Sequence, residues 1–464
     1  MNATCIVATT AATCLAVSGL SLAQSTTEDL AREVATLREA MATQDARHDA
    51  EIAAIRDEQG EDWLTEERAS EIRSVVTDVL ADASTRGSMQ GDGATAGWDK
   101  SRGFFIASAD GNFELRVVGQ MQWRYAYQGI SGEGDDSNTS GFELGHAKIS
   151  FKGFIADPSW QYEVQGAFNK SGGAFQLENT YIRKELDGGQ ALQLGQFKDR
   201  GVYEEFTSDT KQTFVDRSVV TRYFTTKRIM GLAWEWTGES LRTYASFNDG
   251  GNSANTTITT KPCDWAVSGR LDWLAAGAWK QFGEMMSFRG AEMAIMAGAA
   301  IHYEAGRDYT TSTAGVDGTA DNLSWVVDLN ARGGGWSALV GYYGNQSDFG
   351  DGVSPSSTGI LVQGGYFITD TWELAAGWQW VDVDSDGSTS TSTFATQRFW
   401  ITTFGANYYI DGNRAKFQVD CGWSNGAILF SKGIYGDGIS GADWATDSDG
   451  ETQVVLRAGV QLLF

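Results

Sequence analysis

The 464-residue sequence contains few cysteines, histidines and prolines, with 4, 3 and 3 residues of each type. Cys5 and Cys14 lie in an apolar stretch at the amino terminus, which leaves Cys263 and Cys421 for the rest of the chain. Two cysteines cannot build a disulfide framework or a structural zinc site. We therefore expect neither.

Basic residues are also scarce, with 35 Lys and Arg against 60 Asp and Glu and a formal net charge of -25. This charge repels phosphate backbones and disfavours a nucleic-acid partner. After the first two dozen residues no apolar run reaches the ~18 residues that a membrane-spanning helix needs. An aromatic content of 12% disfavours disorder. A large soluble β protein or a membrane β-barrel remains.

The amino terminus resembles a secretory signal. The chain is small and apolar, without a charge, from Cys5 to Leu22, and the triplet Ser21, Leu22, Ala23 fits the small-x-small cleavage rule. We predict a signal peptide over residues 1–23, so that the protein is exported. An uncleaved anchor is the alternative.

Residues 24–85 have a different composition, because Gly and aromatic residues almost vanish between Thr26 and Ser84. This stretch holds 16 acidic and 6 basic residues. Apolar residues recur at alternating spacings of four and three, as in Leu30, Val34, Leu37 and Met41. That spacing predicts a periplasmic α-helical coiled coil, with a monomeric helix as the alternative. Residues 86–102, rich in Gly, Ser and Thr, are predicted to be a linker.

The remainder, residues 103–464, alternates between apolar and polar positions. From Phe113 to Tyr127 the odd positions are almost all apolar or aromatic and the even positions mostly polar. Strands of soluble sandwiches usually span five or six residues, and this one is about fifteen long. A strand of that length crosses a membrane at a tilt.

Sixteen such segments follow one another, which predicts an all-β, sixteen-stranded antiparallel transmembrane β-barrel preceded by an N-terminal α-helical coiled coil. Even-numbered connections are mostly short and odd-numbered ones mostly long, as in outer-membrane barrels. One even connection, about 275–290, is too long for this scheme, and the odd connection near Lys170 is too short. The segments begin at 113 and continue near 142–155, 160–169, 174–184, 190–198, 228–236, 241–248, 264–274, 291–304, 322–332, 335–344, 358–368, 371–381, 396–409, 414–423 and 452–464.

The last strand supports an outer-membrane location. Its alternate positions from Val454 to Phe464 form one apolar row, and Phe464 is the final residue of the sequence. This pattern resembles the terminal signal that the outer-membrane assembly machinery reads. Aromatic residues such as Trp123, Trp234 and Trp378 lie near strand ends, where they would meet lipid headgroups.

Several segments resemble the phosphate-selective porin O and P family: FELGHAKISFKGFIADPSWQYEVQ, LQLGQFKDR, FVDRSVV and FGANYYIDGNRAKFQVD. The resemblance covers about residues 103–464. It implies a homotrimer of sixteen-stranded outer-membrane channels that pass phosphate or polyphosphate through a constriction of Arg and Lys. The family's basic residues cannot be matched one by one here.

Side chains on the polar faces of the first two strands, together with the long connection from Asp199 to Lys227, provide the candidate constriction. We expect this connection to fold into the lumen; the alternative is that it caps the mouth or packs against a neighbouring subunit. Opposed charges across a narrow gap would create a strong transverse field. The predicted pore-lining and constriction residues are Arg116, Arg124, Lys148, Lys152, Arg200, Glu204, Glu205, Lys211 and Arg217, with His146 beside them.

Taken over all strands, the predicted lumen is nearly neutral. Eight basic strand positions face nine acidic ones, which suggests a weak anion preference and leaves a nonselective or cation-favouring channel as the alternative. The further positions are Arg270, Arg332, Lys416 and Arg457, and Glu114, Glu163, Glu178, Glu235, Asp272, Glu304, Asp328, Glu373 and Asp420.

Catalytic motifs are missing from the sequence, since no nucleophile elbow, phosphate loop or paired-histidine zinc helix occurs. Asp382, Asp384 and Asp386 begin like a calcium loop, but Thr393 replaces its final glutamate. We expect no enzyme activity, no cofactor and no metal. The predicted function is passive diffusion of small hydrophilic solutes, which by family resemblance are anions such as phosphate; the alternative is an outer-membrane anchor tethered to a periplasmic layer through the coiled coil.

Overall fold

The computed structural model describes most of the chain from residue 93 onward. The described residues are 43, 47, 93–99, 103–131, 137–170, 172–309, 318–350, 352–386, 394–426, 428–430, 433–435, 444–445 and 452–464. Apart from Thr43 and Arg47, they all belong to the compact unit Gln90–Phe464. The predicted signal peptide and coiled coil therefore lie outside the described residues.

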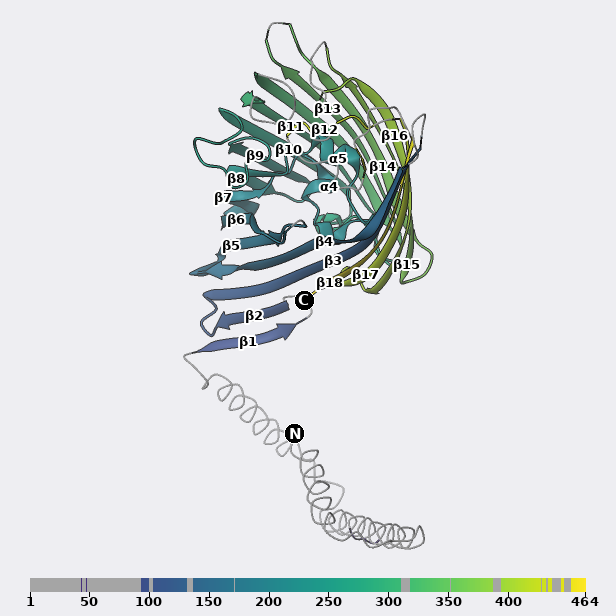
Figure 1. Cartoon of the computed structure of the whole chain (residues 1–464). Coiled ribbons are helices and arrows are strands. Elements are labelled where there is room, and N and C mark those ends of the chain that lie inside the picture. Colours follow the sequence, from purple (N-terminus) through teal and green to yellow (C-terminus); the bar gives the residue numbers. More distant parts are fainter. Residues whose placement is uncertain are drawn as a thin grey trace, which may run out of the picture. The chain divides into compact units, whose positions relative to one another are not determined.

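A closed antiparallel barrel forms the body of this unit (Figure 1). Of the eighteen strands in the sheet, the last sixteen pair in sequence order, and β18 pairs with β3 to close the wall. The predicted sixteen-stranded barrel is confirmed. Its strands are β3 (Phe113–Ser131), β4 (Ser137–Ile155), β5 (Asp157–Phe168), β6 (Phe175–Leu186), β7 (Gln190–Lys198), β8 (Arg228–Thr237), β9 (Leu241–Asn248), β10 (Trp265–Ala276), β11 (Ala294–Asp308), β12 (Thr319–Gly333), β13 (Trp336–Asp348), β14 (Ser356–Phe367), β15 (Trp372–Asp384), β16 (Gln397–Asp411), β17 (Ala415–Asn425) and β18 (Thr452–Leu463).

The alternation of residues decides which face of each strand meets lipid. On β3 the side chains of Met121 and Trp123 are 40% and 53% exposed on the outside, whereas Glu114 and Arg124 are buried inside. Successive side chains of a strand point to opposite faces, so a period of two separates an apolar outer wall from a polar inner one. The structure confirms this assignment of faces.

A two-strand hairpin precedes the barrel and corrects the prediction for residues 86–102. β1 (Ala94–Asp99) pairs with β2 (Gly103–Ser108), and β2 pairs with β3, where Phe104 lies opposite Val117. β18 occupies the same edge of β3 only from Gln120 onward, so the start of β3 has free backbone groups that β2 satisfies. Part of the predicted linker is therefore a strand.

The carboxyl terminus closes the seam beside this hairpin. Phe464 and Gly119 exchange two backbone hydrogen bonds, of 2.7 and 3.0 Å. A Cβ atom on Gly119 would lie 2.2 Å from the Phe464 ring, so a residue without a side chain is needed for the ring to lie over β3.

The connection from β7 to β8, residues 199–227, folds into the barrel as predicted; we call it the constriction loop. It carries α4 (Tyr203–Phe206), η3 (Asp209–Lys211) and α5 (Val219–Phe224), and Figure 1 shows α4 and α5 inside the wall. Ser218 caps α5, because its hydroxyl accepts from the Thr221 amide. The other short helices are η2 (Asp187–Gly189) and η4 (Trp279–Phe282).

Contacts with the far wall fix the constriction loop across the lumen. The amide of Asn407 donates to the Thr213 carbonyl over 2.8 Å, and Lys416 donates to the Gln212 carbonyl over 3.0 Å. The Val215 amide donates to Asp420 over 2.9 Å. These partners lie on β16 and β17, so the loop spans the interior from β7 to the opposite side.

An apolar core fills the interior along β10–β18, which we call the packed side. Val219, Val220, Tyr223 and Phe224 of the constriction loop pack there against inward-facing strand residues. Residues that follow β15 and β17 join them, and the Phe430 ring lies 4.4 Å from that of Tyr223. Among the described residues, no helix is both long and apolar enough to cross a bilayer.

Candidate functional site

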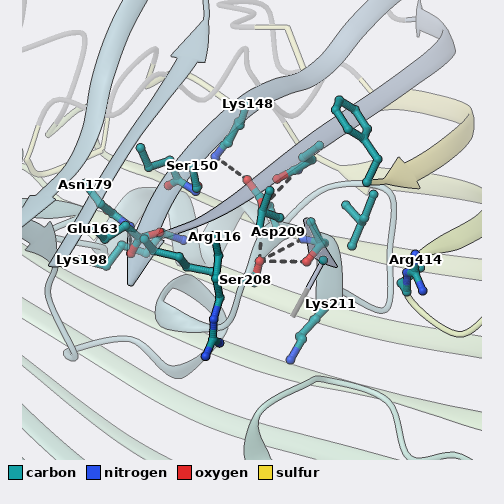
Figure 2. A pocket seen from close by; sticks show the side chains of 18 of the residues that line it. Arg116, Lys148, Ser150, Glu163, Asn179, Lys198, Ser208, Asp209, Lys211 and Arg414 are labelled. Carbon is teal, nitrogen blue, oxygen red and sulfur yellow. Dashed lines mark hydrogen bonds and ion pairs between the residues drawn. The ribbon is translucent and has the colours of Figure 1, made fainter. Parts of the chain in front are cut away.

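Open space inside the barrel lies along β3–β8, which we call the cavity side. A cavity of about 520 Å³ separates the inner faces of these strands from the tip of the constriction loop (Figure 2). Arg414 and Phe464 lie on its border, so the cavity extends to the barrel end where the chain finishes. Its wall is polar, because the inward positions of β3–β6 are mostly charged or amide side chains.

Charge of one sign dominates this cavity. Seven basic and two acidic side chains line it. At close range in a partly enclosed space, such an excess produces a positive potential that attracts anions. The basic residues are Arg116, Lys148, Lys152, Lys198, Lys211, Arg228 and Arg414, and the acidic ones are Glu163 and Asp209.

Asp209 joins the tip of the constriction loop to the wall. Its Oδ2 lies 2.5 Å from Lys148 Nζ, and its Oδ1 accepts from Gln120 over 3.2 Å. Burial alone would raise the pKa of the Asp209 carboxyl, but the nearby charges of Lys148, His146, Arg217 and Lys198 together hold it well below its usual range. The carboxylate therefore stays charged and ties η3 to β3 and β4.

Other cations of the cavity keep their charge available to a solute. Lys152 and Lys211 form no ion pair within 4.0 Å with any residue that the structure describes. Arg116 pairs with Glu114, yet its side chain remains 35% exposed. In Figure 2 the side chains of Arg116 and Lys211 extend toward the lower part of the view, away from Asp209. These three side chains line the cavity.

Four of the nine predicted site residues line the cavity, namely Arg116, Lys148, Lys152 and Lys211. The other five hold the loop or the wall in place. Arg124 pairs with Asp216 of the constriction loop at 2.9 Å, and Arg200 pairs with Glu235 of β8 at 2.9 Å. Their charges are thereby compensated by carboxylates.

Glu204, Glu205 and Arg217 form the internal framework of the constriction loop. The Ser218 hydroxyl donates to Glu204 over 2.6 Å, and Arg217 pairs with Glu205 at 3.4 Å. Burial would raise the pKa of the Glu205 carboxyl, but the charges of Arg217 and Lys198 lower it to about 2. All three side chains are buried.

Lys198, Arg228 and Arg414 line the cavity but were not among the predicted site residues. Lys198 ends β7 and Arg228 begins β8, and the two are register partners. Both residues lie at the predicted ends of these strands. The alternation of inward and outward faces, continued to each strand end, could have identified them as inward-facing. Arg414 lies in a turn, where alternation gives no direction.

Basic side chains on the packed side have the opposite environment. Arg270 donates to both oxygens of Asp328 over 2.8 and 3.0 Å and pairs with Asp272 at 2.7 Å. Arg457 pairs with Asp420 at 2.7 Å. These side chains are buried and their charges are paired within the wall.

A row of hydrogen bonds on the packed side has the residue types of a hydrolase triad. The Ser268 hydroxyl lies 2.8 Å from His302 Nδ1, and His302 Nε2 lies 3.1 Å from Glu304. Asp199 also accepts from Ser268, and Arg307 pairs with Glu304. All three members of the row are buried, so a substrate cannot reach the hydroxyl in this arrangement. The row stabilises the wall.

Comparisons with known proteins agree with this architecture. The model of the family "Phosphate-selective porin O and P" matches residues 115–426. No curated protein matches the sequence. Among solved structures, OmpT of Vibrio cholerae folded in vitro aligns at 15% identity and a TM-score of 0.51, covering 76% of this chain and 98% of its own. The anion-selective porin of Comamonas acidovorans aligns at 10% identity and 0.51, covering 75% and 99%. At these identities the two structures support the fold alone.

Proposed function

Because the chain belongs to the phosphate-selective porin O and P family, and is thus an outer-membrane porin, we propose that it passes small anions such as phosphate by passive diffusion. The path runs along the cavity side of the barrel. The observation that carries this proposal is that Lys152 and Lys211 line the cavity and form no ion pair within 4.0 Å with a described residue.

Electrostatics explains how such a cavity selects without an energy source. A hydrated anion enters a positive potential, which raises its local concentration and lowers that of cations. Arg116 and Lys152 are register partners on β3 and β4, and Lys211 comes from the constriction loop. Conduction requires that the anion bind these side chains weakly enough to leave.

The two acidic residues of the lining reduce this potential only in part. Asp209 is neutralised locally by Lys148, and Glu163 accepts from the Tyr181 hydroxyl over 2.9 Å. Arg228 and Lys148 also share Glu178, which lies behind the lining. Arg116 is paired with Glu114, so the net excess of positive charge is concentrated on Lys152 and Lys211.

Reversal potentials in planar bilayers test the proposal. With the purified porin between unequal concentrations of potassium chloride, the sign of the potential should correspond to chloride as the more permeant ion. Added phosphate should reduce the chloride current, because it competes for the same cations. A reversal potential of the sign expected for potassium would overturn anion selectivity.

Two features of the predicted assembly belong to the same proposal. The family resemblance of residues 103–464 supports a homotrimer. The composition of residues 1–85 supports export by a signal peptide over 1–23 and a coiled coil over 24–85 that attaches the barrel to a periplasmic layer. Cross-linking in intact cells should yield three-subunit species. Deleting residues 24–85 should loosen envelope attachment and leave conductance unchanged, whereas loss of the cross-linked species would assign this segment to assembly instead.

A further inference from the structure

The connection between β10 and β11, residues 277–293, is the long one that did not fit the alternation of short and long connections. It lies at the barrel end where the other described connections are short turns, and it folds into the interior. Phe282, Met285 and Met286 on it are buried, at 5%, 3% and 0% exposure. A segment that buries three large apolar side chains inside the wall is a structural part of the lumen.

This connection contacts the constriction loop at two places. The Met285 amide donates to the Lys211 carbonyl over 3.0 Å. The Tyr203 hydroxyl of α4 donates to the Phe282 carbonyl over 3.0 Å. The first contact lies at the backbone of Lys211, one of the two cavity cations that form no ion pair with a residue that the structure describes.

Arg332 on β12 binds both segments at once. Its guanidinium donates to the Gln281 carbonyl over 2.9 Å and to the Tyr203 hydroxyl over 3.1 Å, and it also donates to the Glu284 carbonyl. It lies over the Phe282 ring at 4.8 Å. Arg332 is 2% exposed, and these carbonyls would lose a charged donor without it.

The far end of the connection is anchored in the wall. Met286 and Phe288 pack against Phe367 of β14 and Tyr409 of β16. The Asn413 amide donates to Glu284 over 2.9 Å. Because the connection is attached to strands at both of its sides, it can hold a fixed position relative to the barrel.

We infer that residues 277–293 form a strut that sets the position of Lys211 in the cavity, with Arg332 as its positioning residue. Long loops are expected at one end of the barrel. The strut reaches the tip of the constriction loop from the other end. As regards selectivity, this inference rests on the proposed function, since Lys211 is one of the cations that would attract the anion.

Conductance and reversal potential should be measured for four proteins: the wild type, Arg332→Lys, Lys211→Gln and the double variant. Lysine keeps the charge but lacks the planar fork that reaches three acceptors. We expect Lys211→Gln to lower the anion-to-cation permeability ratio about twofold, the effect of one screened charge. Arg332→Lys should lower it in the same direction, and the double variant should equal Lys211→Gln alone. Arg398→Lys, which alters an exposed pair with Asp382, is the control and should match the wild type.

A second measurement does not depend on selectivity. In a chain carrying Cys263→Ser and Cys421→Ser, Lys211→Cys is labelled with a negatively charged thiol reagent, with and without Arg332→Lys. The labelling rate should change several-fold when Arg332 is replaced. If Lys211→Gln leaves the reversal potential unchanged, the proposed role of Lys211 in selectivity is wrong. The labelling rate then tests by itself whether residues 277–293 set the position of Lys211.

The inference is overturned if Arg332→Lys leaves the labelling rate of Lys211→Cys unchanged, or if its effect on selectivity adds to that of Lys211→Gln. Where Arg332→Lys does not fold, Tyr203→Phe takes its place under the same criteria. That change removes only the hydroxyl that joins Phe282 and Arg332 to α4.

Discussion

Basic side chains have different environments on the two sides of the barrel interior. On the packed side, Arg270 and Arg457 are buried and each is paired with aspartate. On the cavity side, Lys152 and Lys211 are partly exposed and form no ion pair with a described residue. The difference shows that a count of lumen charges does not predict selectivity, because paired charges add little to the potential that a solute experiences.

The constriction loop creates this difference. It crosses the lumen and brings its apolar residues Val219, Tyr223 and Phe224 to the packed side. It brings Asp209 and Lys211 to the cavity side. A barrel of sixteen strands could hold a wide channel. The loop and the packed side fill part of that space, and a cavity lies along β3–β8.

The largest contrast is expected in stability. Arg270→Gln leaves Asp272 and Asp328 without their buried cation and should destabilise the barrel by about 3–5 kcal/mol. Lys152→Gln on the cavity side removes a partly exposed cation that forms no ion pair with a described residue, and it should cost less than about 1 kcal/mol. Unfolding of both variants in urea, followed by tryptophan fluorescence in detergent, checks this. Equal costs would contradict the division of the interior.

A smaller effect is expected on how the stability of the folded protein depends on pH. The pKa of Glu205 is lowered from 4.5 to about 2 on folding, so its ionised form stabilises the folded state fully above pH 4.5. That contribution is lost as the pH falls from about 4.5 to about 2, because the unfolded state binds the proton first. Glu205→Gln should unfold at a lower temperature than the wild type near neutral pH, and the gap should narrow in acid. A constant gap would show that Glu205 and Arg217 are not coupled as charges.

The smallest effect concerns permeation. Lys152→Gln combined with Lys211→Gln should reduce the anion-to-cation permeability ratio about fourfold, twofold for each screened charge, with little change in stability. Lys261→Gln, in a loop outside the cavity lining, is the control. An unchanged ratio in the double variant would mean that the cavity side does not select.

Much of the fold could be predicted because it depends on a local pattern. Each of the sixteen strands was located, since every one alternates between lipid and lumen faces over its own length. β1 and β2 were missed, because each has only six residues; β2 pairs with the part of β3 that extends past β18, and β1 pairs with β2. The 277–293 connection was recognised as too long, but its length did not reveal that it enters the lumen.

The candidate site was predicted only in part. Arg116, Lys148 and Lys152 followed from the faces of β3 and β4, and Lys211 from the charge of the constriction loop. Glu204, Glu205 and Arg217 were expected to face the pore, yet they bind one another and the loop backbone. Which partner a charged loop residue selects depends on the loop's turns, and sequence spacing does not encode it.

The sequence by itself determined a wall with apolar residues outside and polar ones inside, because a period of two assigns a face to each residue from its nearest neighbours. Only the tertiary structure decided which cations share a cavity and which are paired with carboxylates. That outcome depends on contacts between segments far apart in the chain, such as Lys148 with Asp209 and Met285 with Lys211.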